Sequence, residues 1–139
     1  MNRAPKTMRP AGQKTIWKAA WREIGGVRKY YRSRWEANYA RYLQWLKEQG
    51  QIDDWQHEPK TFWFEGIRRG CTSYLPDFRV VYANGKEEWH EVKGHMDAKS
   101  KTKIKRMAKF YPGVKLEVIC VKRYRGIEKV MGRIIPDWE

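Results

Sequence analysis

Residues 74–93 read YLPDFRVVYANGKEEWHEVK and decide the predicted fold of the chain. The segment 83–85 (Ala-Asn-Gly) separates two stretches rich in β-branched and aromatic residues, which is a strong signal for a β-hairpin. We therefore predict strands over Tyr74–Tyr82 and Lys86–Lys93. Because proline cannot donate a ladder hydrogen bond, Pro76 indicates that the first strand begins at a sheet edge or a bulge.

The length of the hairpin loop decides which way Asp77 points. A two-residue Asn-Gly turn would place Asp77 opposite Val92, on the wrong face of the hairpin. A three-residue loop, with Gly85 in the left-handed conformation, would place Asp77 opposite Glu91. Lys93 shares the face of Glu91, since side chains two residues apart in a strand point the same way. Only the three-residue loop brings both acids and the lysine together.

Two adjacent carboxylates repel each other by about 4 kcal/mol at a separation near 4 Å and an effective dielectric near 20. Asp77 and Glu91 would therefore need a divalent cation, a shared proton or a lysine between them. Their oxygen ligands suit Mg²⁺ or Mn²⁺, which would activate a water and neutralise a scissile phosphate. Lys93 would orient that water or stabilise the developing charge. The alternative is a pair of solvated hairpin acids, with Lys93 in a weak surface ion pair.

The segments around the hairpin predict helices on a small mixed sheet. Ser33 and Glu36 match the S-x-x-E capping box, so a helix begins at Ser33 and ends at Gly50. A helix over residues 97–110, with Ile104, Met107, Ala108 and Tyr111 inward, and a buried strand over 114–121 follow the hairpin. Four further segments are expected: a short helix over 15–24 ended by Gly25-Gly26, a strand over 60–65, a basic loop over 66–72 and a last helix within 124–139. This order predicts an α/β sandwich around a small mixed sheet.

Charge is the strongest signal in the composition. The formal net charge is +14, of which residues 1–29 carry +7 and residues 95–125 carry +8 around a neutral middle. A polyanion such as nucleic acid is the natural partner of two basic blocks, and a basic surface that only confers solubility is the alternative. No apolar run approaches the roughly 18 residues of a membrane span, so we expect no membrane partner. Cys71 and Cys120 are far apart, which argues against a zinc site or a disulfide framework and favours a reducing compartment.

Pro76-Asp77, followed fourteen positions later by Glu91-Val92-Lys93, resembles the signature of the PD-(D/E)XK nuclease superfamily. Over about residues 30–121 the chain resembles, more specifically, the phage endonuclease I type of Holliday junction resolvase. This second resemblance is carried by Tyr31-Arg32-Ser33, Glu36, Tyr74 to Phe78, Asn84-Gly85 and Glu91 to Gly94. Departures that bear on substrate preference are a longer loop with Arg68, Arg69 and Cys71, and the pair His95-Met96.

The basic composition of residues 1–29 predicts an N-terminal arm with a short helix. The resemblance, which covers about residues 30–121, implies a restriction-endonuclease-like nuclease domain over residues 30–139. It implies that Glu36, Asp77 and Glu91 hold Mg²⁺, with Mn²⁺ able to substitute, and that Lys93 assists catalysis. It further implies a homodimer whose chains can intertwine, branched DNA with a four-way junction as substrate, and action in the cytoplasm of a phage-infected bacterium. The capping box alone would explain Glu36 without a catalytic role.

Basic residues outside the hairpin are candidates for contacts with the DNA backbone, since each neutralised phosphate releases counterions. The dense lysine row of the 97–110 helix suits this role. The candidate DNA-binding residues are Arg32, Arg34, Arg68, Arg69, His95, Lys99, Lys101, Lys103 and Lys105.

Other polar and aromatic residues receive structural interpretations. His90 alternates with Glu91 along its strand, so we expect it on the opposite face and outside the site. Glu58 is either an outer acid of the site or, as we favour, a loop charge. The tryptophans are interpreted as core or interface residues rather than base-stacking platforms.

The leading hypothesis is a metal-dependent, structure-selective DNA endonuclease of the junction-resolvase type. A nuclease of the same fold with another target, such as flaps, nicks or duplex, is the first alternative. A non-catalytic DNA-binding module of the same fold is the second.

Overall fold

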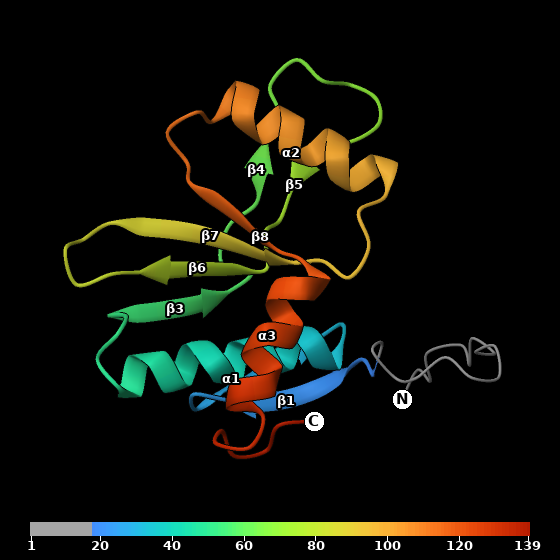
Figure 1. Ribbon diagram of the computed structural model, residues 1–139. Helices are drawn as coiled ribbons and strands as arrows, with labels where there is room; N and C mark the ends of the chain where they lie inside the picture. The colour runs from blue at the N-terminus through green and yellow to red at the C-terminus, as the bar shows by residue number, and fades with distance from the viewer. Residues whose placement is uncertain (1–17) are drawn as a thin grey trace, which may run out of the picture.

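A four-stranded mixed β-sheet lies at the centre of the computed structural model, which describes residues 18–139 (Figure 1). In spatial order its strands are β3 (Asp54–His57), β6 (Phe78–Val81), β7 (Glu87–Val92) and β8 (Leu116–Ile119). The pairs β3–β6 and β6–β7 are antiparallel, whereas β7 and β8 are parallel. The predicted α/β class, with a small mixed sheet flanked by helices, is confirmed.

The helix predicted to begin at Ser33 is α1 (Arg34–Glu48), which lies along one side of the sheet (Figure 1). Ser33 is its N-cap, and the Ser33 hydroxyl accepts a hydrogen bond from the backbone N–H of Glu36 at 3.1 Å. Tyr39 on the apolar side of the helix packs with Phe78 of β6 in the main core. This packing fixes the first turn of α1, and hence Glu36, against the sheet.

A β-hairpin, rather than the predicted helix, precedes α1. Its antiparallel strands are β1 (Ala20–Ile24) and β2 (Val27–Tyr31). Gly25 and Gly26 between them have φ angles of +63° and +78°, and two successive positive φ angles close a two-residue hairpin turn. The helix predicted over residues 15–24 is therefore wrong where the structure describes it; its first three residues lie outside the described part.

The hairpin shares its core with α1. Ile24 and Tyr31, on the inner face of the hairpin, are buried in the main core cluster. Arg22 on the same face forms an ion pair with Glu139, with 2.6 Å between Nε and Oε2. The predicted division between an arm and a nuclease domain after residue 29 falls inside β2, so the described part of the arm is folded with the rest.

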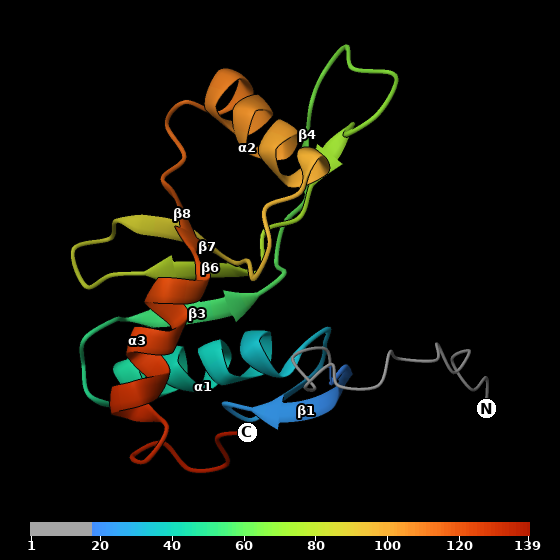
Figure 2. The ribbon, with the colours of Figure 1, turned by 45° about the vertical axis from the view of Figure 1, so that its right-hand side comes forward.

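A smaller group of elements lies on the other side of the sheet from α1 (Figure 2). β4 (Phe62–Trp63) and β5 (Ser73–Tyr74) form a two-stranded sheet, and α2 (Ala98–Phe110) packs beside it. Their common core consists of Phe62, Phe64, Tyr74, Trp89 and Met107. We call this group the small lobe. The helix predicted over residues 97–110 is confirmed, with Asp97 as its N-cap.

Several predicted segments of the small lobe differ in detail. The strand predicted over 60–65 is reduced to β4, and the strand predicted over 74–82 is split into β5 and β6. Pro76 lies in the break, where its missing N–H removes a possible ladder hydrogen bond. Ala108, predicted to face inward, is exposed, whereas Phe110 packs against the small-lobe core.

The C-terminal part of the described chain adds an edge strand and a helix. β8 is shorter than the strand predicted over 114–121, and only Ile119 of its residues is buried because β8 lies at the edge of the sheet. α3 (Val121–Met131) begins directly after it and contributes Tyr124 to the main core, so the last predicted helix starts earlier than expected. No helix within residues 18–139 has the length and apolar character needed to cross a bilayer.

Candidate functional site

The hairpin that carries the predicted acids has the three-residue loop. Gly85 has a φ of +80°, and its backbone N–H donates to the Tyr82 carbonyl oxygen at 2.9 Å. The register of β6 and β7, continued by one residue, places Asp77 opposite Glu91. Of the two loops considered for this hairpin, the one that unites the acids is therefore confirmed.

Asp77 and Glu91 are each hydrogen-bonded to the backbone of the opposite strand. The Asp77 N–H donates to Glu91 Oε2 at 3.1 Å, and the Val92 N–H donates to Asp77 Oδ2 at 2.8 Å. Asp77 is 9% exposed and Glu91 is 8% exposed. These values rule out the alternative of a solvated pair of hairpin acids.

Glu36 brings a third carboxylate to the same place. Its Oε2 accepts a hydrogen bond from the Arg32 backbone N–H at 2.6 Å, and the residue is 4% exposed. Its carboxyl group lies against that of Asp77, close enough for the two to share a proton. Ser33 caps the helix as predicted, while the Glu36 side chain turns toward the other acids. We call Glu36, Asp77 and Glu91 the carboxylate cluster.

Burial and mutual repulsion set the protonation of the carboxylate cluster. Burial raises the pKa of Asp77 well above its usual range, and the charges of Glu91 and Glu36 raise it further. Burial also raises the pKa of Glu91, although the nearby Lys93 ammonium opposes the rise. Burial acts to raise the pKa of Glu36 as well, but hydrogen bonding, with His57 foremost, holds this pKa below its usual value. The cluster therefore favours an added positive charge, from a proton or a cation.

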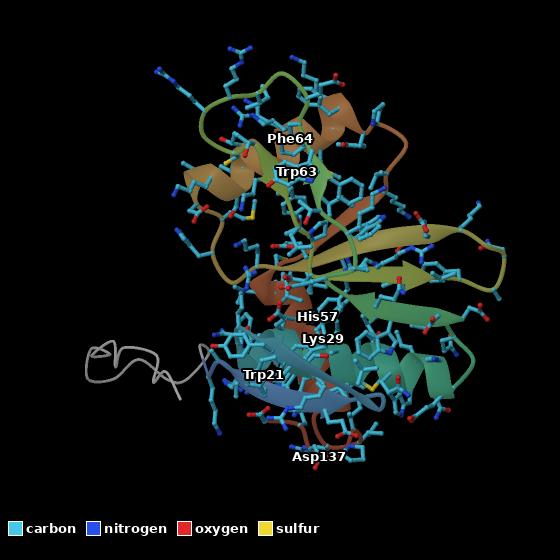
Figure 3. The ribbon with its side chains drawn as sticks, turned by 180° about the vertical axis from the view of Figure 1, so that it is seen from behind. Trp21, Lys29, His57, Trp63, Phe64 and Asp137 are labelled. Carbon is cyan, nitrogen blue, oxygen red and sulfur yellow. The ribbon has the colours of Figure 1, made fainter. Side chains whose placement is uncertain are left out.

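His57 adjoins the cluster, although the sequence did not assign it to the site. It is the last residue of β3, and its Nε2 lies 3.3 Å from Glu36 Oε1. The Tyr31 ring stacks on the imidazole with 4.3 Å between ring centroids. Figure 3 labels His57 where the sheet approaches α1. The imidazole is therefore held by Glu36 at its edge and by the Tyr31 ring on its face.

Glu58, favoured as a loop charge, is also part of the site. Its Oε1 lies 3.9 Å from His57 Nε2 and 3.5 Å from the Arg32 guanidinium. Its φ is +47°, a left-handed conformation that non-glycine residues rarely adopt, and its N–H donates to the Asp77 carbonyl oxygen at 2.8 Å. Uncommon backbone angles of this kind concentrate at functional sites. In the sequence, the only indication of Glu58 was a His-Glu pair after a polar segment. This pair could be assigned to the site only once the segment was recognised as strand β3.

Glu36, His57 and Glu58 form a group that could hold a metal ion. One donor atom from each lies within 4.8 Å of the others, and two of the three residues are buried. Two carboxylate oxygens and an imidazole nitrogen form a mixed donor set that divalent metals accept. Glu36 is the one predicted ligand in this group, which His57 and Glu58 complete, whereas Asp77 and Glu91 are not part of it.

Lys93, the fourth predicted catalytic residue, lies near the cluster. Its positive charge acts on Glu91 and partly offsets the rise that burial causes in the pKa of that carboxyl group. On the small-lobe side, the Tyr74 hydroxyl lies beside Glu91 without hydrogen-bond geometry to it. Burial raises the pKa of Tyr74, so its hydroxyl stays protonated. The Glu91 carboxylate thus has an ammonium group and a hydroxyl group as neighbours.

His90 lies outside the site, as predicted. Its Nδ1 is 2.6 Å from the Tyr39 hydroxyl, and its Nε2 is 3.0 Å from Glu88 Oε2. Both contacts lie on the face of β7 opposite to Glu91. Burial lowers the pKa of His90, which favours the neutral imidazole. His90 is therefore a core histidine.

A cavity of about 380 Å³ reaches His57 from the side of the β1–β2 hairpin. Its walls also include Lys29, Tyr31, Gln44 and Trp55. Within the described chain, the Tyr31 hydroxyl and His57 Nδ1 are buried without a hydrogen-bond partner. Both residues line the cavity, which leaves space for water next to the imidazole.

The predicted DNA-binding residues lie in three places. The Arg32 side chain is 70% exposed beside Glu58, and Arg34 Nη1 donates to the Glu139 carbonyl oxygen at 2.8 Å. Arg68 and Arg69 are exposed on the loop between β4 and β5. The last group belongs to α2 and the segment before it, where four residues are exposed and Lys103 is half-buried: His95, Lys99, Lys101, Lys103 and Lys105.

These features define a mixed α/β protein with a buried, carboxylate-rich site that could hold a metal ion. Residues 18–126 match the model of the family described as "Protein of unknown function (DUF1064)", and the chain belongs to this family. The matched range includes the carboxylate cluster, His57, Glu58 and Lys93. No curated protein matches the chain.

Proposed function

We propose that this protein is a metal-dependent DNA endonuclease that hydrolyses phosphodiester bonds in branched DNA, with four-way junctions as its preferred substrate. The observation that carries the proposal is the convergence of Glu36, Asp77 and Glu91 in one buried cluster beside Lys93. It is supported by the resemblance of these residues to the PD-(D/E)XK signature.

Electrostatics supports a cation at this cluster. Buried carboxylates in contact repel each other, and protonation of one would relieve the repulsion but would remove a charged oxygen ligand. Asp77 cannot escape the repulsion by turning outward, since its side chain accepts from the Val92 N–H and its own N–H donates to Glu91. Occupation by a divalent cation would relieve this repulsion while all three acids stay ionised.

We assign Mg²⁺, with Mn²⁺ as a substitute, to Glu36, Asp77 and Glu91. Such an ion would supply an activated water and charge neutralisation at the phosphate. The imidazole of His57 adds a nitrogen donor next to Glu36, and nitrogen ligands favour Mn²⁺ over Mg²⁺. Lys93 would stabilise the negative charge that develops on the phosphate oxygens.

DNA binding is assigned to the basic residues of the small lobe, to Arg32 just before α1 and to Arg34 at its start. Contacts between these residues and phosphates would position the duplex without reading its sequence, so selectivity would come from branched shape. A homodimer would offer two such sites to a two-fold junction. The dimer, the phage origin and the bacterial cytoplasm rest on the resemblance to the junction resolvases.

The deciding experiment is digestion of a synthetic four-way junction and of a linear duplex of the same sequence. The purified protein is incubated with each substrate in Mg²⁺, Mn²⁺ or EDTA. We expect cleavage of the junction in Mg²⁺ and Mn²⁺, slower cleavage of the duplex and none in EDTA. Equal rates on both substrates would remove the junction preference while keeping the nuclease. No cleavage with either metal would contradict the proposed activity.

A further inference from the structure

The outer face of the β1–β2 hairpin carries two large aromatic side chains in solvent. Trp21 is 60% exposed and Tyr30 is 45% exposed. The two residues are cross-strand partners, and their rings meet edge to face with 5.8 Å between centroids. Figure 3 labels Trp21 on the hairpin, in front of α1. We call Trp21 and Tyr30 the aromatic pair.

Packing of the hairpin does not require the aromatic pair. The inner face already supplies Ile24 and Tyr31 to the main core. Side chains alternate along each strand, so residues 21 and 30 point away from that core. An exposed aromatic patch on a charged surface is a typical site of interaction.

The charges around the aromatic pair favour a polyanion as the occupant. The exposed Arg28 guanidinium lies 5.7 Å from the centre of the Trp21 ring. Glu23 is the single acid of β1 and β2. A second copy of a chain with a net charge of +14 would bring like charges together here. Nucleic acid instead offers phosphates to the cations and flat bases to the rings.

The aromatic pair is also connected to the candidate site through β2. Tyr31 follows Tyr30 directly and stacks on His57. The next residue, Arg32, donates its backbone N–H to Glu36. Tyr30 points to the opposite face of β2, so the aromatic pair and the candidate site are joined by one strand but lie on its two faces.

We propose that the aromatic pair binds unpaired nucleotides by stacking, so that the substrate includes a single-stranded or unstacked segment. This inference rests on the proposed function and specifies its substrate. Duplex DNA cannot use the same contacts, because its bases are already stacked on each other. The aromatic pair would therefore distinguish the open strand of a branch or flap from a linear duplex.

The test is binding of fluorescent oligothymidine and of a linear duplex, measured by anisotropy in EDTA. We expect Trp21→Ala and Tyr30→Ala each to weaken oligothymidine binding about tenfold, the scale of one lost stacking contact. Trp21→Phe should retain most of the affinity, and duplex binding should change little. Trp63→Ala is the matched control, because Trp63 is 66% exposed on the small lobe, and it should bind oligothymidine like the parent.

Three results would overturn the inference. The first is unchanged oligothymidine binding by both alanine variants, with circular dichroism showing that they are folded. The second is an equal loss of oligothymidine affinity in Trp63→Ala. That result would mean that any exposed aromatic side chain contributes to binding and that the aromatic pair is not a specific site. The third is a dimer in sedimentation that Trp21→Ala dissociates without any effect on binding. All binding is measured without divalent ions, so it does not depend on cleavage. The binding results therefore test the aromatic pair even if the proposed nuclease activity is absent.

Discussion

Asp77 combines features that conflict unless a positive charge is present. Its side chain is 9% exposed and touches Glu36, while its backbone N–H donates to Glu91. Asparagine in its place would keep a carbonyl oxygen for the Val92 N–H but would lose the charge. Asp77 is thus the residue at which the proposed binding of a cation and the proposed binding of DNA can be separated.

We expect Asp77→Asn to lower the cleavage rate at least about a hundredfold, the scale of losing one electrostatic catalytic group. Junction binding in EDTA should stay close to that of the parent, since the basic residues that contact phosphate are unchanged. Cleavage is followed by gel and binding by anisotropy. Glu87→Gln, at an exposed acid of the neighbouring strand β7, is the control and should keep parental cleavage. A parental rate in Asp77→Asn would exclude the acid from catalysis.

The raised pKa of Asp77 also predicts how stability depends on pH. The folded-state pKa lies above the usual value of 3.8, so protonation of Asp77 favours the folded protein. This stabilisation is fully present below pH 3.8 and is lost as the pH rises through the folded-state pKa. In EDTA, Asp77→Asn should therefore gain stability relative to the parent as the pH rises above 3.8. Urea unfolding measures the difference; a constant difference would contradict the expectation.

His57 provides a test of metal preference at the level of one side chain. His57→Gln removes the nitrogen that lies 3.3 Å from Glu36 Oε1, so Mn²⁺ binding should weaken about tenfold while Mg²⁺ binding changes less. The electron paramagnetic resonance signal of free Mn²⁺ measures the first affinity, and competition with Mg²⁺ measures the second. His90→Gln is the control, because His90 bonds to Tyr39 and Glu88 instead. Equal losses in both variants would argue against His57 as a ligand.

At the scale of elements, the β1–β2 turn offers a matched pair of glycines. Both have positive φ, but a Cβ at Gly25 would lie 2.6 Å from Gln44 Oε1, whereas a Cβ at Gly26 would meet nothing within 4 Å. We expect Gly26→Ala to cost about 1 kcal/mol of unfolding free energy, from backbone strain alone. Gly25→Ala should cost more, because Gln44 also accepts a hydrogen bond from Trp55 Nε1. Urea unfolding of the two variants compares the costs, and equal values would contradict this account.

Elements with complete local signals were predictable from the sequence. Ser33 and Asp97 are the N-caps at which α1 and α2 begin. Gly85, in the left-handed conformation, determines the hairpin register that places Asp77 opposite Glu91. Two elements were missed because their signals depend on partners far along the chain. β3 is four residues long and becomes a strand by pairing with β6, and the Gly25-Gly26 turn resembles a helix end until β1 and β2 are paired.

The candidate site was predictable to the same degree. Glu36, Asp77, Glu91 and Lys93 belong to a recognisable spacing, and the structure brings them together. His57 and Glu58 have no such spacing, since they enter the site only through the pairing of β3 with β6. The exposed aromatic pair was not predicted either. Residues 15–24 were expected to form a helix, and Trp21 was interpreted as a core or interface residue.

At the scale of the whole molecule, the net charge of +14 predicts a steep salt dependence of DNA binding. Each phosphate contact contributes about −0.9 to the slope of log affinity against log salt concentration for duplex DNA. Alanine at the exposed Lys99, Lys101 and Lys105 together should lower the affinity and flatten this slope. Lys86→Ala, in the turn between β6 and β7, should leave the slope unchanged. A flat profile for the parent would argue against use of the basic residues.

The break at Pro76 has a consequence for how the two halves of the molecule work together. The chain passes between the sheet and the small lobe four times: just after β3, between β5 and β6, just after β7, and between α2 and β8 (Figure 2). Glu58, Asp77 and Lys93 lie in the first three of these crossings. These three candidate-site residues therefore lie where the sheet meets the small lobe. A tilt of the small lobe relative to the sheet would change the distances among their side chains before it disturbed either core.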